Sequence, residues 1–216
     1  MSVPRAVPER RQSLGEEIAN SISHGVGLVA ALVATPFLLT HALRRGPAPF
    51  VVGASVFAAS MVLLYLASTV YHALPRGRVK RGMQVVEHCA IFLLIAGTYT
   101  PFALGVLRGV WGWALLGLAW GLAAVGIALK AVAGVRYPAV SLLLYLGMGW
   151  LFVLALPPLS IHLPLAGLLW LLFGGLAYTA GVGFFAARRL PYAHFVWHMF
   201  VLAGTACHFV AVLRYA

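Results

Sequence analysis

Charged residues are scarce in this 216-residue chain: only 9% of its residues are Asp, Glu, Lys or Arg, and only four are acidic. A soluble domain carries roughly a quarter charged residues, so this composition excludes an ordinary soluble protein. Hydrophobic residues make up 62% of the chain, and the mean hydropathy is +0.97. Together these values indicate an integral membrane protein of the all-α class.

Cysteine is also rare. The two cysteines, Cys89 and Cys207, each lie within an apolar stretch, and we expect two buried thiols in separate helices rather than a disulfide. The N-terminus shows no pattern of a cleavable signal peptide, because the first 17 residues are polar and the following apolar stretch is long enough to stay as an anchor. We therefore expect residues 1–17 to form a short cytoplasmic segment and residues 18–216 to form a single transmembrane domain.

Seven apolar stretches come close to the ~20 residues that a spanning helix requires. Segments rich in Gly, Pro and Arg separate them, and these connections are too short to contain a further domain. The sequence therefore predicts a seven-transmembrane helix bundle, with spans at 18–43, 50–74, 85–107, 111–132, 138–156, 163–187 and 192–215.

The positive charges follow the alternation of these spans. Eleven Lys and Arg residues fall on the side of the N-terminus and four on the other side. By the positive-inside rule, the N-terminus is cytoplasmic and the C-terminus outside. The basic residues cluster between apolar stretches, which is typical of membrane topology and lipid contact, so we expect no nucleic-acid partner despite the net charge of +11.

Two histidines lie one turn apart at the start of the last predicted span. His194 and His198 are separated by four residues, so both project from the same face of a helix. His72 closes the second span at the same cytoplasmic level. Three neutral imidazoles leave a fourth position for water, which is the arrangement of a catalytic zinc site rather than a closed structural one. Imidazole also suits iron, copper and nickel, so zinc is a preference.

Glu87 opens the third span and is the only acidic residue beyond the first 17 residues. An unpaired charge within a bilayer costs ~2.5–3.5 kcal/mol, which leaves two interpretations. Glu87 either pairs with Lys80 or Arg81 just upstream, or lies beside the metal, where it orients a ligand or acts as base on a water there. Ser68 shares a helical face with His72 and would hold that water or the carboxylate.

The chain resembles the hemolysin III family, the bacterial branch of the progestin and adipoQ receptor group, within the wider superfamily that includes alkaline ceramidases. The resemblance covers nearly the whole chain, and its motifs are EEIANSISHG (16–25), STVYH (68–72), EHCAIFLLIAGTYTP (87–101) and HFVWH (194–198), followed by His208. It implies zinc bound by His72, His194 and His198, with supporting roles for Ser68 and Glu87. The third-helix acid of the family is usually aspartate, so the extra methylene of Glu87 alters how the carboxylate reaches the metal or its water.

Three other polar residues, Asn20, His24 and His208, also lie within predicted spans. Asn20 and His24 share the cytoplasmic level of the site, and either support the metal ligands or form hydrogen bonds between helices. His208 lies ten residues beyond His198, about 15 Å along the helix axis. It cannot share the same ion, and we expect a hydrogen-bonded packing role.

Three functions remain open. The first is a metal-dependent hydrolase of a lipid amide or ester in the bacterial inner membrane, in which a metal activates the carbonyl and Glu87 moves a proton. The second is a receptor-like or regulatory protein in which the metal mainly ties helices together. The third is a pore-forming cytolysin, but the outer half of the predicted bundle has no polar stripe to line an aqueous path.

Overall fold

All regular secondary structure in residues 10–107, 109–187 and 189–216, which the computed structural model describes, is helical. Residues 1–9 of the predicted N-terminal segment lie outside this part of the chain, as do Arg108 and Arg188 of the charge count. The helices are α1 (Leu14–Arg45), α2 (Ala48–Ala73), α3 (Arg78–Pro101), α4 (Gly109–Ala133), α5 (Pro138–Gly149), α6 (Leu156–His162), α7 (Leu165–Ala186) and α8 (Ala193–Tyr215). A π-helical segment, Phe102–Leu107, extends α3, and a 3₁₀ turn, Leu151–Val153, follows α5.

Six helices are long and apolar enough to cross a membrane, and a bent pair is a seventh candidate. That pair, Pro138–Val153 and Leu156–His162, bends by 47°, so the fifth predicted span, 138–156, is a broken helix, and the connection predicted after it is helical over Leu156–His162. The reason lies in Pro157 and Pro158, which have no N–H to donate to the carbonyls one turn earlier. The chain therefore forms a 3₁₀ turn and starts a new helix, with the prolines in its first turn, where no donor is needed.

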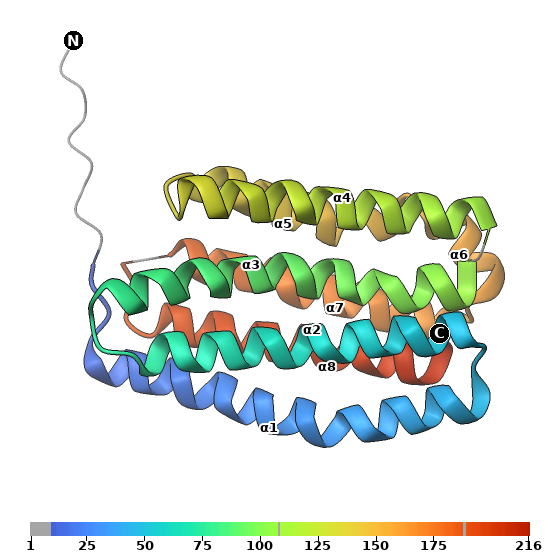
Figure 1. Ribbon diagram of the computed structural model, residues 1–216, viewed down its shortest axis with the longest axis horizontal. Helices are drawn as coiled ribbons and strands as arrows, with labels where there is room; N and C mark the ends of the chain where they lie inside the picture. Colours follow the sequence, from blue (N-terminus) through green and yellow to red (C-terminus); the bar gives the residue numbers. More distant parts are fainter. Residues whose placement is uncertain (1–9, 108, 188) are drawn as a thin grey trace, which may run out of the picture.

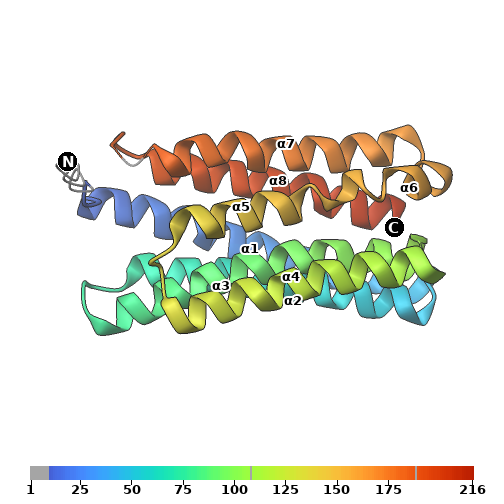
Figure 2. The same cartoon turned by 90° about the horizontal axis from the view of Figure 1, so that it is seen from above.

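The helices run side by side along the long axis of the molecule (Figure 1). The contacts place α1 against α2 and α8, α2 against α3, α3 against α4, and α7 against α8. Seen from above, α7 and α8 lie on one side, α2, α3 and α4 on the other, and α5 between them (Figure 2). The start of α1 and the end of α8 lie at opposite ends of the bundle (Figure 1). The chain is thus a multi-pass membrane protein.

The beginning of α1 is fixed to the beginning of α8. Ser13 caps α1 in a capping box with Glu16, whose Oε2 accepts the Ser13 N–H at 2.8 Å. The other carboxylate oxygen, Oε1, accepts the backbone N–H of Tyr192 at 2.8 Å and is also bonded by Arg10. Tyr192 precedes α8 with φ of 57°, a left-handed conformation that is costly for a residue with a side chain. The Glu16 bond helps hold this turn, which sets the start of the helix that carries His194 and His198.

The two cysteines lie in separate helices without a disulfide, as expected, but both are only partly buried rather than buried. Cys89 lies in α3 and Cys207 in α8, and both are free thiols.

Candidate metal centre

Four residues from three helices converge at the end of the bundle where α1 begins. His72 lies in the last turn of α2, Glu87 in α3, and His194 and His198 in the first two turns of α8. One possible ligand atom from each lies within 4.8 Å of every other. The structure therefore brings together all three histidines predicted as ligands, together with the predicted acid.

The donor set fits a metal ion. His72, Glu87 and His198 are buried, with 4%, 5% and 1% of their surface exposed. The Nε2 atoms of His72 and His194 have no hydrogen-bond partner among the described residues, although His72 Nε2 lies 3.6 Å from Glu87 Oε1. A buried polar atom without a partner costs about 1–3 kcal/mol. A cation between these atoms would remove that cost, and three imidazoles with one carboxylate suit zinc and other transition metals.

The hydrogen bonds of His72 and His198 fix which ring nitrogen faces the cluster. His72 Nδ1 lies 2.8 Å from Glu17 Oε2, and because an ionised carboxylate only accepts, Nδ1 is the protonated nitrogen. His198 Nδ1 lies 3.2 Å from the Asn20 carbonyl and 2.9 Å from Ser23 Oγ, and the carbonyl likewise requires Nδ1 to donate. Each Nε2 then carries its lone pair toward the cluster, as metal-bound histidines held by outer partners do.

The carboxylate of Glu87 is oriented by Ser68, whose Oγ donates to Glu87 Oε1 at 2.6 Å. Ser68 is fully buried. Lys80 does not pair with Glu87; it bonds Glu17 Oε2 at 2.9 Å and the Leu74 carbonyl at 3.1 Å. The interpretation of Glu87 as the ion partner of Lys80 or Arg81 is therefore wrong: Lys80 turns toward α1, and no ion pair joins Glu87 to Arg81, both of which the structure describes.

Sequence reasoning did not assign a role to Glu17, which contacts the His72 ring. It left the role of His24 open, and the structure stacks that ring on His198, with centroids 3.6 Å apart and an angle of 6°. Both nitrogens of His24 are buried without a partner among the described residues. The signal was present in the spacing: Glu17, Asn20 and His24 lie at i, i+3 and i+7, which is one face of a helix.

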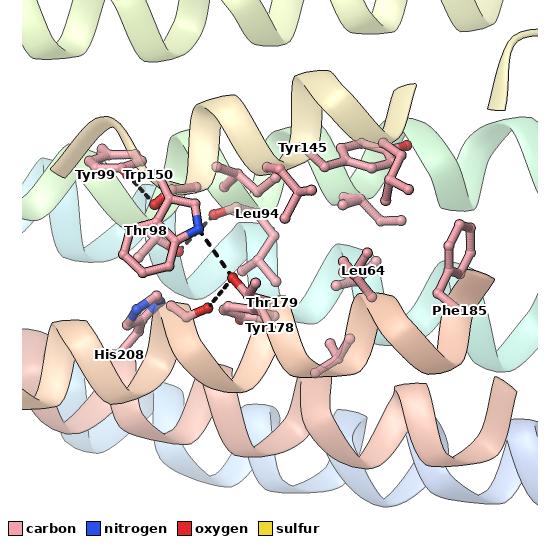
Figure 3. Close-up of a pocket in the computed structure, with 18 of the residues that line it drawn as sticks. Leu64, Leu94, Thr98, Tyr99, Tyr145, Trp150, Tyr178, Thr179, Phe185 and His208 are labelled. Carbon is pink, nitrogen blue, oxygen red and sulfur yellow. Dashed lines mark hydrogen bonds between the residues drawn. The ribbon is translucent and has the colours of Figure 1, made fainter. Parts of the chain in front are cut away.

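An internal cavity of about 120 Å³ extends from the cluster along the bundle axis. Its lining includes Glu87, His194 and His198 at one end, and the rest is mostly apolar or aromatic. Figure 3 shows Tyr145 and Phe185 at one end of this cavity and Trp150 and His208 toward the other. Phe185 packs against the ring of His194, so the end of the cavity at Phe185 is the end that borders the cluster. The cavity thus joins a polar site to a long apolar space.

His208 lies away from the cluster, as expected. Its Nε2 donates to the Leu171 carbonyl of α7 at 3.2 Å, and its ring lies where a side chain on Gly174 would have to be. This agrees with the predicted packing role. At that end of the cavity, Trp150 Nε1 donates to Thr179 Oγ1 at 3.1 Å (Figure 3).

The fold and this cluster define a class: a helical multi-pass membrane protein with a buried His/Glu group, at one end of its bundle, that can bind a metal ion. The family model described as Haemolysin-III related matches residues 12–209, so the chain belongs to the haemolysin III-related family. It is 45% identical to "Hemolysin-3" of Bacillus cereus over 94% of this chain and 93% of that one. It is 42% identical to the "Hemolysin-3 homolog" of Bacillus subtilis over 94% and 95%.

A human protein is more distantly similar. "Monocyte to macrophage differentiation factor" is 30% identical over 93% of this chain and 84% of that protein. The resemblance that the sequence motifs suggested is thereby confirmed at the level of the family.

Proposed function

We propose that this protein is an intramembrane zinc hydrolase that cleaves an amide or ester bond of a membrane lipid at the cytoplasmic side of the bacterial inner membrane. The observation that carries the proposal is the buried group of His72, Glu87, His194 and His198 at the end of an apolar cavity. A hydrolase that acts on lipids needs such a pairing, because its polar reacting group and its acyl chain require different surroundings.

His72, His194 and His198 would hold the ion, with Ser68 and Glu87 beside it. When bound, zinc polarises a carbonyl and makes water a better nucleophile. Ser68 occupies Glu87 Oε1, which leaves Oε2 of Glu87 to accept the proton of the attacking water and return it to the leaving group. The cavity would hold the acyl chain and exclude bulk water from the reacting bond.

The test measures metal first and activity second. Wild-type protein purified in mild detergent is expected to contain about one zinc per chain by elemental analysis, and His198→Ala to lose it. Zinc-loaded protein is then incubated with a panel of ceramides and acyl amides, and the released fatty acid is measured. A wild type that binds no metal contradicts the metal site, and a loaded protein that cleaves none of the panel contradicts the hydrolase.

The same preparations test the alternatives. Protein that binds metal but cleaves no lipid fits a receptor-like or regulatory protein, in which the ion ties α2 and α8 together. Liposomes loaded with a fluorescent dye test the lytic activity that the name Hemolysin-3 gives to a relative. We expect no leakage, because the lining of the cavity is mostly apolar and offers no continuous polar path for ions.

A further inference from the structure

A chain of three charged or polar side chains connects the surface of the bundle to the metal cluster. Lys80 Nζ lies 2.9 Å from Glu17 Oε2, and the same oxygen lies 2.8 Å from His72 Nδ1. The side chains of Glu17, Lys80 and His72 are 19%, 11% and 1% exposed, so the two outer partners keep some contact with the surface and the imidazole is buried. The three residues come from α1, α3 and α2 respectively.

Lys80 makes a second contact on the same side. Its Nζ donates to the carbonyl of Leu74 at 3.1 Å, and Leu74 caps the C-terminus of α2, two residues beyond His72. The positive charge of Lys80 also interacts favourably with the negative, C-terminal end of the α2 helix dipole. Lys80 therefore touches both the helix end that carries His72 and the carboxylate that orients its ring.

We infer that Glu17 and Lys80 act as a pair of positioning residues for His72, so that metal affinity depends on a lysine that does not touch the ion. The inference rests on the proposed metal site. Glu17 holds the His72 ring through Nδ1 and thereby aims Nε2 at the cluster. Lys80 holds Glu17, because one carboxylate oxygen serves both partners and cannot move toward one without leaving the other.

The physical reason is the cost of ordering an imidazole. A free ring can rotate about its side-chain bonds, and binding an ion would then have to fix it. A carboxylate that accepts from Nδ1 fixes the orientation in advance and raises the basicity of the ligating nitrogen. Loss of such an outer partner typically lowers metal affinity about 10- to 100-fold. Lys80 keeps the Glu17 carboxylate directed toward His72, so loss of the lysine has the same effect through the carboxylate.

The experiment measures zinc affinity by competition with a chromogenic chelator, using full-length protein in detergent. Glu17→Gln is expected to raise the Kd for zinc about 10- to 100-fold. Lys80→Met should also raise the Kd for zinc, by about 3- to 30-fold, because the Glu17 carboxylate remains but loses its ion pair with Lys80. Arg81→Met removes an exposed positive charge from the next position and serves as the matched control, with an unchanged Kd expected.

The double variant separates this role from a merely structural one. If Lys80 acts through Glu17, Lys80→Met adds nothing to the Kd in the Glu17→Gln background. If Lys80→Met lowers zinc affinity in the Glu17→Gln background as much as it does in the wild type, Lys80 acts by capping α2 at Leu74. That result would overturn the inference. The absorption bands of bound Co²⁺ give a second measure, since a reoriented imidazole changes them whereas a distant structural effect does not. Lys80→Arg, which keeps the positive charge, should have a zinc affinity much closer to that of the wild type than Lys80→Met has.

The outcomes distinguish this inference from the proposed function. Wild-type protein that binds no zinc would remove both. Wild-type binding with an unaltered Kd in Glu17→Gln would overturn the positioning role and leave the metal site standing. Lys80→Gln replaces the methionine variant if that variant does not fold, as judged by size-exclusion chromatography and circular dichroism.

Discussion

At the scale of single residues, the centre depends on which atoms of each side chain are already engaged. His72 and His198 each use Nδ1 in a hydrogen bond to a group from α1, which leaves Nε2 for an ion. Glu87 is oriented in the same manner by Ser68. The polar residues around the cluster therefore orient the side chains of the proposed metal site.

Removing the Ser68 hydroxyl tests, in the absence of metal, whether Ser68 orients and stabilises the Glu87 carboxylate. In metal-free protein, Ser68→Ala should lower the free energy of unfolding by about 1.5–3 kcal/mol, because a buried carboxylate loses a charge-assisted hydrogen bond. Denaturation in detergent monitored by circular dichroism measures the change. Ser55→Ala is the control: Ser55 also lies in α2 but is exposed, so its loss should change stability by no more than about 0.5 kcal/mol. Equal losses in the two variants would contradict the structural role of the Ser68–Glu87 bond.

At the scale of the helices, glycines set how closely two of them approach. A Cβ on Gly53 of α2 would lie 2.6 Å from the Cα of Pro101 and 3.0 Å from the Thr100 carbonyl of α3. These are backbone atoms, which cannot move aside as a side chain could. This contact holds α2 and α3 together, and they carry His72 and Glu87 respectively.

Gly53→Ala should therefore destabilise the protein by about 1–3 kcal/mol, the usual cost of overfilling a packed interface. The matched control is Gly117→Ala in α4, where nothing lies within 4 Å of the new Cβ. That substitution should be neutral or stabilising by up to about 1 kcal/mol, because alanine favours helix more than glycine does. Melting temperatures in detergent compare the two. A Gly53→Ala variant as stable as Gly117→Ala would show that α2 and α3 can separate at little cost.

At the scale of the whole molecule, the site lies at the end of the bundle where α1 begins and α7 ends (Figure 1). We propose that this end faces the cytoplasm, because most basic residues flank it. We propose that the bent pair α5–α6, which extends along the bundle (Figure 2), forms one crossing, so that α1 starts and α8 ends on opposite faces of the membrane.

Reporter fusions test this orientation. Alkaline phosphatase fused after residue 216 should be active, since it folds only outside the cytoplasm, whereas a fusion placed between α7 and α8, at residue 190, should be inactive. A fluorescent protein that requires the cytoplasm should give the reverse pattern. The opposite result in both pairs would place the metal centre on the outer face and exclude cytoplasmic lipid headgroups as its access route.

The amino-acid sequence by itself determined the spans and the local spacing of the ligands. A run of ~20 apolar residues in a bilayer must satisfy its own backbone, and an α-helix does so within one segment. His194 and His198 share a face for the same local reason, and the helical rise separates His208 from them. Pro157 and Pro158 also marked the end of the fifth predicted span, but the sequence did not show that the segment containing them forms a further helix, α6.

Only the tertiary structure decided which side chains meet across helices. Lys80 lies closer in sequence to Glu87, yet it bonds Glu17, 63 positions away. Glu17 in turn bonds His72, 55 positions away. Hydropathy and periodicity report which face of a helix is buried but not which helix lies against it. The partner of a buried charge follows from packing. Packing made α1, which supplies none of the proposed ligands, the helix that holds His72 and His198 in place.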